Sequence, residues 1–117
     1  MELKFMDNTK NDDYYVDKIL KYAERIVIRL SNVDYDSFVF NLDVQEAMMF
    51  NLVQISENAK RISDNCKLTR TNVPWKDLIR LRNRIVHDYG HVVLDVVCYT
   101  LKNDIPESVN VLKNEQE

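Results

Sequence analysis

The chain has 117 residues, of which 45% are hydrophobic and 30% are charged, and its formal net charge at pH 7 is −3. This length suits one domain with one modest core and excludes two independent ones. The acidic balance excludes attraction of nucleic acid over the whole surface, so any attraction to a phosphate backbone must come from a local basic patch. We expect a single domain over residues 1–117, with its core at about 13–112 and loose ends.

Two further classes of protein are disfavoured by the residue content. Cys66 and Cys98 are isolated and lack ligand-like neighbours, which favours reduced thiols over a disulfide scaffold or a zinc site. No apolar run approaches the roughly 18 to 20 residues that span a bilayer, and no basic-then-apolar leader opens the sequence. We therefore expect a cytoplasmic protein without a membrane contact, a metal or a cofactor.

Residues 13–30 are expected to form the first helix, because apolar side chains recur at steps of three and four residues. Its predicted buried face consists of Val16, Ile19, Leu20, Ala23, Ile26, Val27 and Leu30. The stretch 31–34 then breaks the pattern with Ser, Asn and Asp, which prefer caps and turns. With one glycine and two prolines in the chain, helices joined by short polar loops are the natural architecture.

A second helix is expected to begin near Asp43, because Glu46 follows at the spacing of a capping box. Its apolar positions are Val44, Ala47, Met48, Leu52, Ile55, Ala59 and Ile62, and Met49, Phe50 and Val53 widen this stripe. An apolar surface on more than half of a helix predicts a central place in the bundle or a part in an oligomer interface.

Residues 66–73 are expected to form a loop, after which Pro74 marks the start of a third helix. The apolar positions of that helix are Trp75, Leu78, Ile79, Leu81, Ile85 and Val86, and Gly90 is expected to cap its end. A fourth helix is predicted at about 94–112, kinked or divided at Pro106, with a frayed tail over 113–117. These elements predict an all-α bundle of four or five antiparallel helices.

The stretch 76–91, here called the basic segment, carries both histidines of the chain. Its charged residues are Lys76, Arg80, Arg82 and Arg84 against Asp77 and Asp88. On an ideal helix Asn83 and His87 lie one turn apart and about 40° from each other, whereas Arg82 points about 140° away from His87. The long side chain of Arg82 is therefore expected to reach around the helix, or the helix to change geometry at its end.

These residue types match the needs of RNA phosphodiester cleavage. Histidine supplies a base near neutrality for the 2′-hydroxyl, and arginine binds the phosphate oxygens on which charge grows. Asn83 is a candidate to orient His87 or to donate to the phosphate. Plainer interpretations also stand: a histidine near a helix end as a cap, an arginine face that is merely solvated, and Tyr89 as an amphipathic residue closing the bundle. From the residues alone, the segment is a candidate basic site on a helical protein.

The segment Arg82-Asn83-Arg84-Ile85-Val86-His87 resembles the Arg-x4-6-His motif of HEPN domains, and its continuation to Tyr89 resembles the Arg-x4-His-x-Tyr signature of HepT-like toxins. Glu57-Asn58-Ala59-Lys60 is similar to the family's Gly-Glu-Ala-Ala/Lys stretch. Pro74-Trp75 and Asp104-Ile105-Pro106 also fall at family-like distances. The resemblance covers roughly residues 13–106.

The resemblance implies an all-α HEPN bundle that forms a homodimer and acts as a metal-independent endoribonuclease toxin. It implies that Arg82 and His87 are catalytic with Asn83 assisting, and we expect Arg80 and Arg84 to bind RNA phosphates. It further implies a cognate minimal nucleotidyltransferase antitoxin that adenylylates Tyr89. The alternatives are a noncatalytic nucleotide- or RNA-binding partner subunit of a nucleotidyltransferase, and a purely structural bundle.

Three positions depart from the family pattern. Ser56 stands where the family usually has glycine, so we expect less close helix packing there. Cys98 stands where many members have tryptophan, and Gly90 stands where an aromatic residue often follows the tyrosine. None of the three removes a predicted catalytic residue. Because Arg82 and His87 should act in a cleft, we expect both to be exposed.

Overall fold

The computed structural model describes residues 11–87 and 94–116, and these residues form helices and no strands. The helices are α2 (Asp12–Leu30), α3 (Tyr35–Val39), α4 (Leu42–Lys60), α5 (Asp64–Thr69), α6 (Trp75–His87), α7 (Leu94–Tyr99), the π-helical turn η2 (Thr100–Asp104) and α8 (Ile105–Gln116). The predicted all-α bundle is confirmed. No helix within the described ranges is long and apolar enough to cross a membrane.

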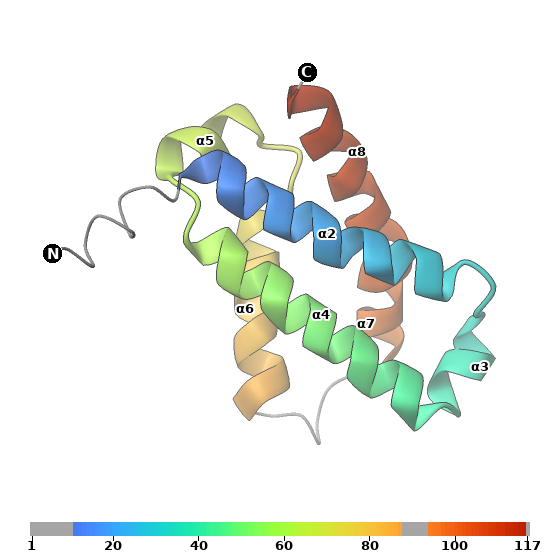
Figure 1. Ribbon diagram of the computed structural model, residues 1–117. Coiled ribbons are helices and arrows are strands. Elements are labelled where there is room, and N and C mark those ends of the chain that lie inside the picture. Colours follow the sequence, from blue (N-terminus) through green and yellow to red (C-terminus); the bar gives the residue numbers. More distant parts are fainter. Residues whose placement is uncertain (1–10, 88–93, 117) are drawn as a thin grey trace, which may run out of the picture.

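The long helices pack in two layers (Figure 1). α2 and α4 lie antiparallel in one layer, with α6 packed behind α4 and α8 packed behind α2. The core between the layers is built from buried aliphatic side chains of all four helices, among them Ile26, Leu52, Ile55, Ile85 and Leu112. Because α4 contacts α2, α3 and α6, its central place in the bundle explains most of its wide apolar stripe, with Phe50 as an exposed exception.

α2 matches its predicted range to within one residue at each end. Asn11 caps it by accepting from the Tyr14 amide, and the predicted face is buried except for Val27, which is 38% exposed. The expectation for Val27 is wrong because it lies at the edge of the buried face, whereas Ile26 and Leu30 at the same end of α2 are buried.

α4 begins at Leu42 rather than at the predicted capping box. The cap is Asn41, whose Oδ1 accepts a hydrogen bond from the Val44 amide at 3.1 Å. Asp43 lies inside the first turn, so the predicted pairing of Asp43 with Glu46 is wrong. Ala47 is exposed, because it lies on the outer side of the helix.

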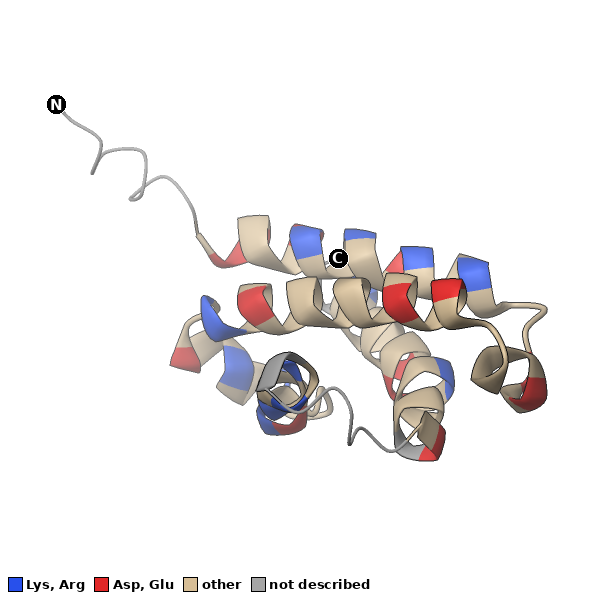
Figure 2. Ribbon diagram, turned by 90° about the horizontal axis from the view of Figure 1, so that it is seen from below, with Lys and Arg blue, Asp and Glu red and all other residues tan. Residues whose placement is uncertain are grey.

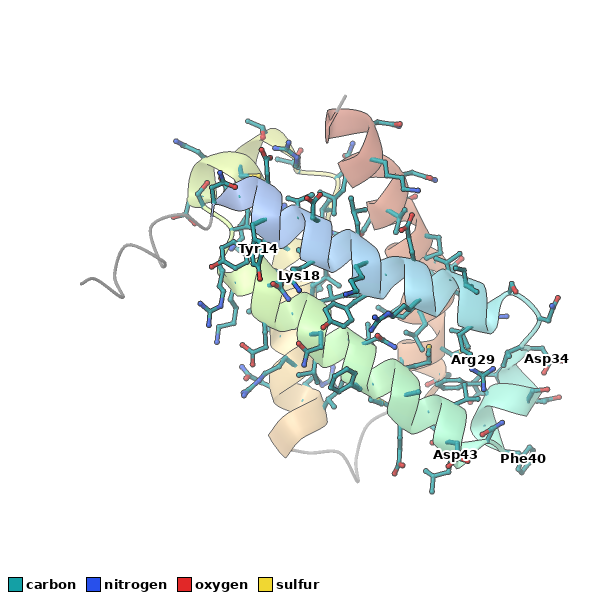
Figure 3. The ribbon with its side chains drawn as sticks, viewed as in Figure 1. Tyr14, Lys18, Arg29, Asp34, Phe40 and Asp43 are labelled. Atoms are coloured by element: carbon teal, nitrogen blue, oxygen red, sulfur yellow. The ribbon has the colours of Figure 1, made fainter. Side chains whose placement is uncertain are left out.

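The outer face of the α2–α4 layer carries aromatic residues that lie outside the core. Phe50 is 55% exposed and packs edge-to-face on Tyr22 of α2, with 6.4 Å between ring centres. Near the start of α2 the Lys18 ammonium lies 5.6 Å from the centre of the Tyr14 ring (Figure 3). Phe40, at the α3–α4 corner, is 87% exposed and points away from the bundle (Figure 3).

Two short helices were not predicted. α3 is capped by Asp34 and is anchored by Phe38, which is 1% exposed, while the Gln45 amide donates to the Phe38 and Val39 carbonyls. α5 overlaps the predicted loop over residues 66–69, so that expectation is wrong. Its cap is Ser63, whose amide and hydroxyl both donate to the Asp12 carboxylate, at 2.8 and 2.6 Å. These hydrogen bonds lower the pKa of Asp12.

The C-terminal arm, α7–η2–α8, is divided close to the predicted position. Pro106 has no amide hydrogen to donate to the Lys102 carbonyl, which interrupts the α-helical ladder where η2 gives way to α8. α8 then continues to Gln116, beyond the predicted helix end at about residue 112. The Lys113 ammonium forms an ion pair with Glu24, which ties this end of α8 to α2. The predicted cap at Gly90 lies outside the described residues.

Candidate functional site

The site is built on α6, which the fold holds at both its start and its middle. The Trp75 indole N–H donates to the Arg70 carbonyl at 3.0 Å, and the Leu78 amide donates to the Pro74 carbonyl. Trp75, Leu78 and Ile85 are buried. The helix therefore starts at Pro74-Trp75 as predicted, and it ends at His87.

Ser56 of α4 makes a direct polar link to α6. Its side chain is fully buried, and its hydroxyl donates to the Ile79 carbonyl at 3.1 Å. Because a buried hydroxyl must find a partner, this bond fixes the two helices relative to each other. Serine in place of glycine is thus accommodated at the α4–α6 contact by a hydrogen bond between the helices.

Arg82 is directed toward α4, where it meets Glu57. The Arg82 Nε donates to Glu57 Oε2 at 2.8 Å, and its Nη1 donates to Asn83 Oδ1 at 3.2 Å. The side chain of Arg82 is 28% exposed, so the expectation that it is exposed is wrong: its stem and Nε face α4. Nη2 has no hydrogen-bond partner among the described residues, which leaves one edge of the guanidinium for another ligand.

Of the other two predicted catalytic residues, the structure describes all of Asn83 and the backbone of His87. Asn83 is exposed, and its amide oxygen is oriented by Arg82. His87 is the last residue of α6, one turn beyond Asn83, with its backbone placed and its side chain outside the description. Tyr89, the predicted modification site, and His91 lie outside the described residues. The structure therefore joins Arg82 to Asn83 and orders them one turn before His87.

Arg80 and Arg84, the predicted phosphate-binding residues, lie on a different side of α6 from Arg82. Both line a groove between α6 and the C-terminal arm. Arg80 is paired with exposed Asp77, with 2.8 Å between Nη2 and Oδ1, whereas exposed Arg84 has no partner in the described part of the chain. In Figure 2 basic positions lie on α5 and α6, together with some acidic ones, and form a further row along α2, whereas several acidic positions lie on α4 and along the arm. The arginines of the basic segment therefore do not converge on one point.

Glu57 is the residue that the sequence analysis missed. It lies in the stretch 57–60 that carries part of the family resemblance, but 25 residues separate it from Arg82 and no local pattern links the two. Only the packing of α4 against α6 brings the carboxylate to the guanidinium.

The cysteines are not candidates for nucleophiles. Cys66 and Cys98 are buried free thiols, and burial raises the pKa of each. Both therefore stay protonated at neutral pH. No group of three or more metal-ligating side chains occurs within residues 11–87 and 94–116.

Comparison with known proteins shows the family to which the chain belongs. The family model described as Ribonuclease HepT-like matches residues 19–114. A Methanocaldococcus jannaschii protein named "Putative RNase MJ1216" is 30% identical over 89 residues, which are 76% of this chain and 74% of that protein. "Putative RNase TTE0752" of Caldanaerobacter subterraneus is 26% identical over 93 residues, 80% of this chain and 83% of that protein. "Probable ribonuclease HepT" of Thermococcus cleftensis is 28% identical over 92 residues, 79% and 84% of the two chains. No solved structure matches significantly.

Proposed function

This chain belongs to the HepT-like ribonuclease family, and from that premise we propose that it is a metal-independent endoribonuclease toxin. The observation that carries the proposal is the Arg82 guanidinium, held by Glu57 and Asn83 one turn from the end of α6, where His87 lies. RNA cleavage requires a base and a fixed cation, and we assign these roles to His87 and Arg82, which lie five residues apart on the same helix.

In the proposed reaction His87 takes the proton of the 2′-hydroxyl. The 2′ oxygen forms a bond to phosphorus, and the bond from phosphorus to the 5′ oxygen breaks. The leaving 5′ oxygen takes its proton from the imidazolium of His87. The products are a 2′,3′-cyclic phosphate and a 5′-hydroxyl. Charge gathers on the non-bridging oxygens during this step, and the open Nη2 edge of Arg82 is the donor assigned to them.

The contacts of Arg82 support its assignment as the phosphate ligand. Glu57 fixes Nε and Asn83 fixes Nη1, so the guanidinium plane needs little reorganisation when the substrate binds. Donors that are already oriented stabilise a developing charge more than mobile ones. Asn83 thereby assists through Arg82, and Arg80 and Arg84 bind phosphates farther along the RNA.

We further propose a homodimer in which two copies of the basic segment share one cleft. The net charge of a single chain is −3, so one copy attracts RNA weakly. Two basic segments facing each other would concentrate positive charge at the cleft and leave the acidic balance elsewhere.

The proposed control of the toxin is adenylylation of Tyr89 by a cognate minimal nucleotidyltransferase antitoxin. Tyr89 follows His87 by two residues. AMP on its hydroxyl would bring a phosphate anion and a bulky base next to the arginines. The modification would occupy the RNA phosphate site and repel the substrate.

The test is cleavage of total RNA and tRNA by the purified chain in EDTA, with His87→Ala and Arg82→Ala alongside. We expect the wild type to cut and to leave cyclic-phosphate ends, and each variant to lose at least about a hundredfold of the rate. His91→Ala is the matched control, because it removes the other histidine of the segment and should keep the activity.

Failure of the unmodified wild type to cut RNA that a verified family member cuts would refute the proposal. An intact-mass spectrum shows whether the purified chain carries AMP. Saturable RNA binding without cleavage, unchanged in His87→Ala, would instead support the noncatalytic partner subunit.

A further inference from the structure

The groove between α6 and the C-terminal arm has a volume of about 620 Å³ and is not used by the catalytic groups proposed above. Its walls are Pro74, Asp77, Leu78, Arg80, Leu81 and Arg84 on the α6 side, and Asp95, Tyr99, Thr100 and Asp104 on the arm. Leu78 is buried and Leu81 half-buried, so the floor is apolar and the edges are charged. Such a mixture of apolar floor and a few polar groups is typical of a small-ligand site.

The α6 edge of the groove suits an anionic group. Arg84 is exposed and has no partner among the described residues. His87 follows it by three residues and lies on the next turn of the same helix. A phosphate bound to Arg84 would therefore lie about one helical turn from His87. This adjacency connects the groove to the proposed cleavage site.

The arm carries the groups that suit a nucleobase. Tyr99 is 61% exposed and lines the groove, which makes its ring available for stacking. Asp104 is half-buried, and its carboxylate makes no hydrogen bond or ion pair within the described residues. Burial, and then the nearby Glu107 and Asp77 carboxylates, raise the pKa of Asp104.

The backbone places Asp104 in a special position. It is the last residue of the π-helical turn η2, and such turns recur at functional sites because the widened turn re-aims side chains. The turn ends two residues before Pro106, which has no amide hydrogen, so the sequence itself fixes where the hydrogen-bond pattern changes. Asp104 thus lines the groove from the π-helical turn that interrupts the α-helical arm.

The balance of charge decides between ligands. Three aspartates and two arginines line the groove, so a polyanionic backbone running its full length is disfavoured. A single nucleotide fits better, with its phosphate at Arg84 and its base between Tyr99 and Asp104. A carboxylate accepts hydrogen bonds from the exocyclic amino groups of cytosine, adenine and guanine, whereas uracil has no exocyclic amino group and presents a carbonyl where cytosine has its own.

We propose that this groove binds the base of the nucleotide next to the cleaved bond, and that Asp104 selects bases with an exocyclic amino group over uracil. The proposal rests on the ribonuclease function proposed above. It assigns Tyr99 to stacking, Asp104 to selection and Arg84 to the phosphate of that nucleotide.

The first experiment maps cleavage positions in a pool of short RNAs of random sequence. For the wild type we expect uracil to be depleted about tenfold at one position beside the cut, the size of effect that one hydrogen bond to a charged group gives. Asp104→Asn should abolish the depletion, because an amide also donates to the uracil carbonyl. Tyr99→Leu should slow cleavage about tenfold whatever the base.

The matched control is Glu107→Gln, which removes a neighbouring carboxylate of the same arm that does not line the groove. It should keep the wild-type preference. An unchanged preference in Asp104→Asn, or a wild type without any preference, would overturn the proposal.

The second experiment keeps the groove testable if no cleavage is seen. Binding of 5′-CMP and 5′-UMP to the full chain is followed by amide chemical shifts, with thermal melting to verify that each variant folds. We expect CMP to bind about tenfold more tightly than UMP, and Asp104→Asn to bind the two equally. If the chain never cuts RNA but binds CMP selectively in an Asp104-dependent way, the nuclease function is refuted and the proposal that the groove binds a nucleotide is supported. Equal binding of CMP and UMP by the wild type would refute the groove, whether or not the chain cuts RNA.

Discussion

The two sides of α6 differ in how their polar side chains are used. On the side facing α4, the Ser56 hydroxyl donates to the Ile79 carbonyl and Arg82 donates to Glu57, so two polar links join the neighbouring helices. On the side facing the C-terminal arm, Arg84 and Asp104 border a groove and have no partners in the described part of the chain.

This difference separates two tasks that the sequence motif presents together. A cation fixed by a carboxylate is suited to stabilise charge at one place, because its position is set before the substrate arrives. Unpartnered groups along a groove are suited to bind a ligand, because they lose no protein contact when it enters. We therefore propose that the side of α6 facing α4, here called the closed side, serves catalysis. The side facing the C-terminal arm, here called the open side, would serve recognition of the RNA.

The largest expected effect comes from breaking the closed side with Ile55→Asp. Ile55 of α4 is 1% exposed in the core, and an aspartate there would be a buried charge without a partner. We expect the free energy of unfolding to fall by about 4 kcal/mol, measured by urea denaturation.

The control for this substitution is Ala47→Asp on the same helix. Ala47 is exposed, so the same new carboxylate should change the free energy of unfolding by no more than about 0.5 kcal/mol. A stable Ile55→Asp chain would show that the core face of α4 is misassigned.

A smaller effect is expected from Glu57→Gln, which tests the fixed position of Arg82. The amide still accepts a hydrogen bond from Nε but loses the charge that holds the guanidinium. We expect kcat to fall about tenfold with KM nearly unchanged, because the contact matters most when charge develops on the phosphate. Stability should change by less than about 1 kcal/mol, since the Glu57 side chain is 38% exposed.

Glu46→Gln supplies the matched control, because Glu46 is exposed on the same helix and its carboxylate forms no ion pair or hydrogen bond among the described residues. It should leave kcat as in the wild type. Glu57→Asp tests geometry alone and should recover part of the rate if its shorter carboxylate still reaches Nε. A Glu57→Gln enzyme with wild-type kcat would show that Arg82 does not depend on this pair for its position.

Features governed by local sequence were predictable. The repeat of apolar residues predicted α2 and α6, and Pro106 predicted the break in the last helix, because each depends on residues a few positions apart. The start of α4 was misplaced by one competing signal, since Asp43 and Asn41 are both good caps and only the backbone selects Asn41.

Features governed by long-range contacts were not predictable. α5 depends on the bonds between Ser63 and Asp12, which are 51 residues apart, and five-residue α3 is too short to show a period. The same reason hid Glu57 as the partner of Arg82. The family resemblance singled out Arg82, Asn83 and His87 as a set, but the separation of Arg82 from Arg80 and Arg84 on two sides of α6 depends on the packing of α4 and the arm.

The smallest expected effect concerns the open side of α6, where we compare RNA binding by Arg84→Ala and Arg80→Ala. Each change removes one positive charge, but Arg80 is already bound to Asp77, whereas Arg84 has no partner in the described residues. In a His87→Ala background, where cleavage is silenced, we expect Arg84→Ala to weaken binding of a short RNA about fivefold and to lower the salt slope by roughly one. Arg80→Ala should weaken binding less, and Asp77→Asn should tighten it by releasing Arg80. Equal losses for the two arginines would mean that RNA displaces Asp77 at little cost, and the distinction between paired and unpaired cations on this side of α6 would then fail.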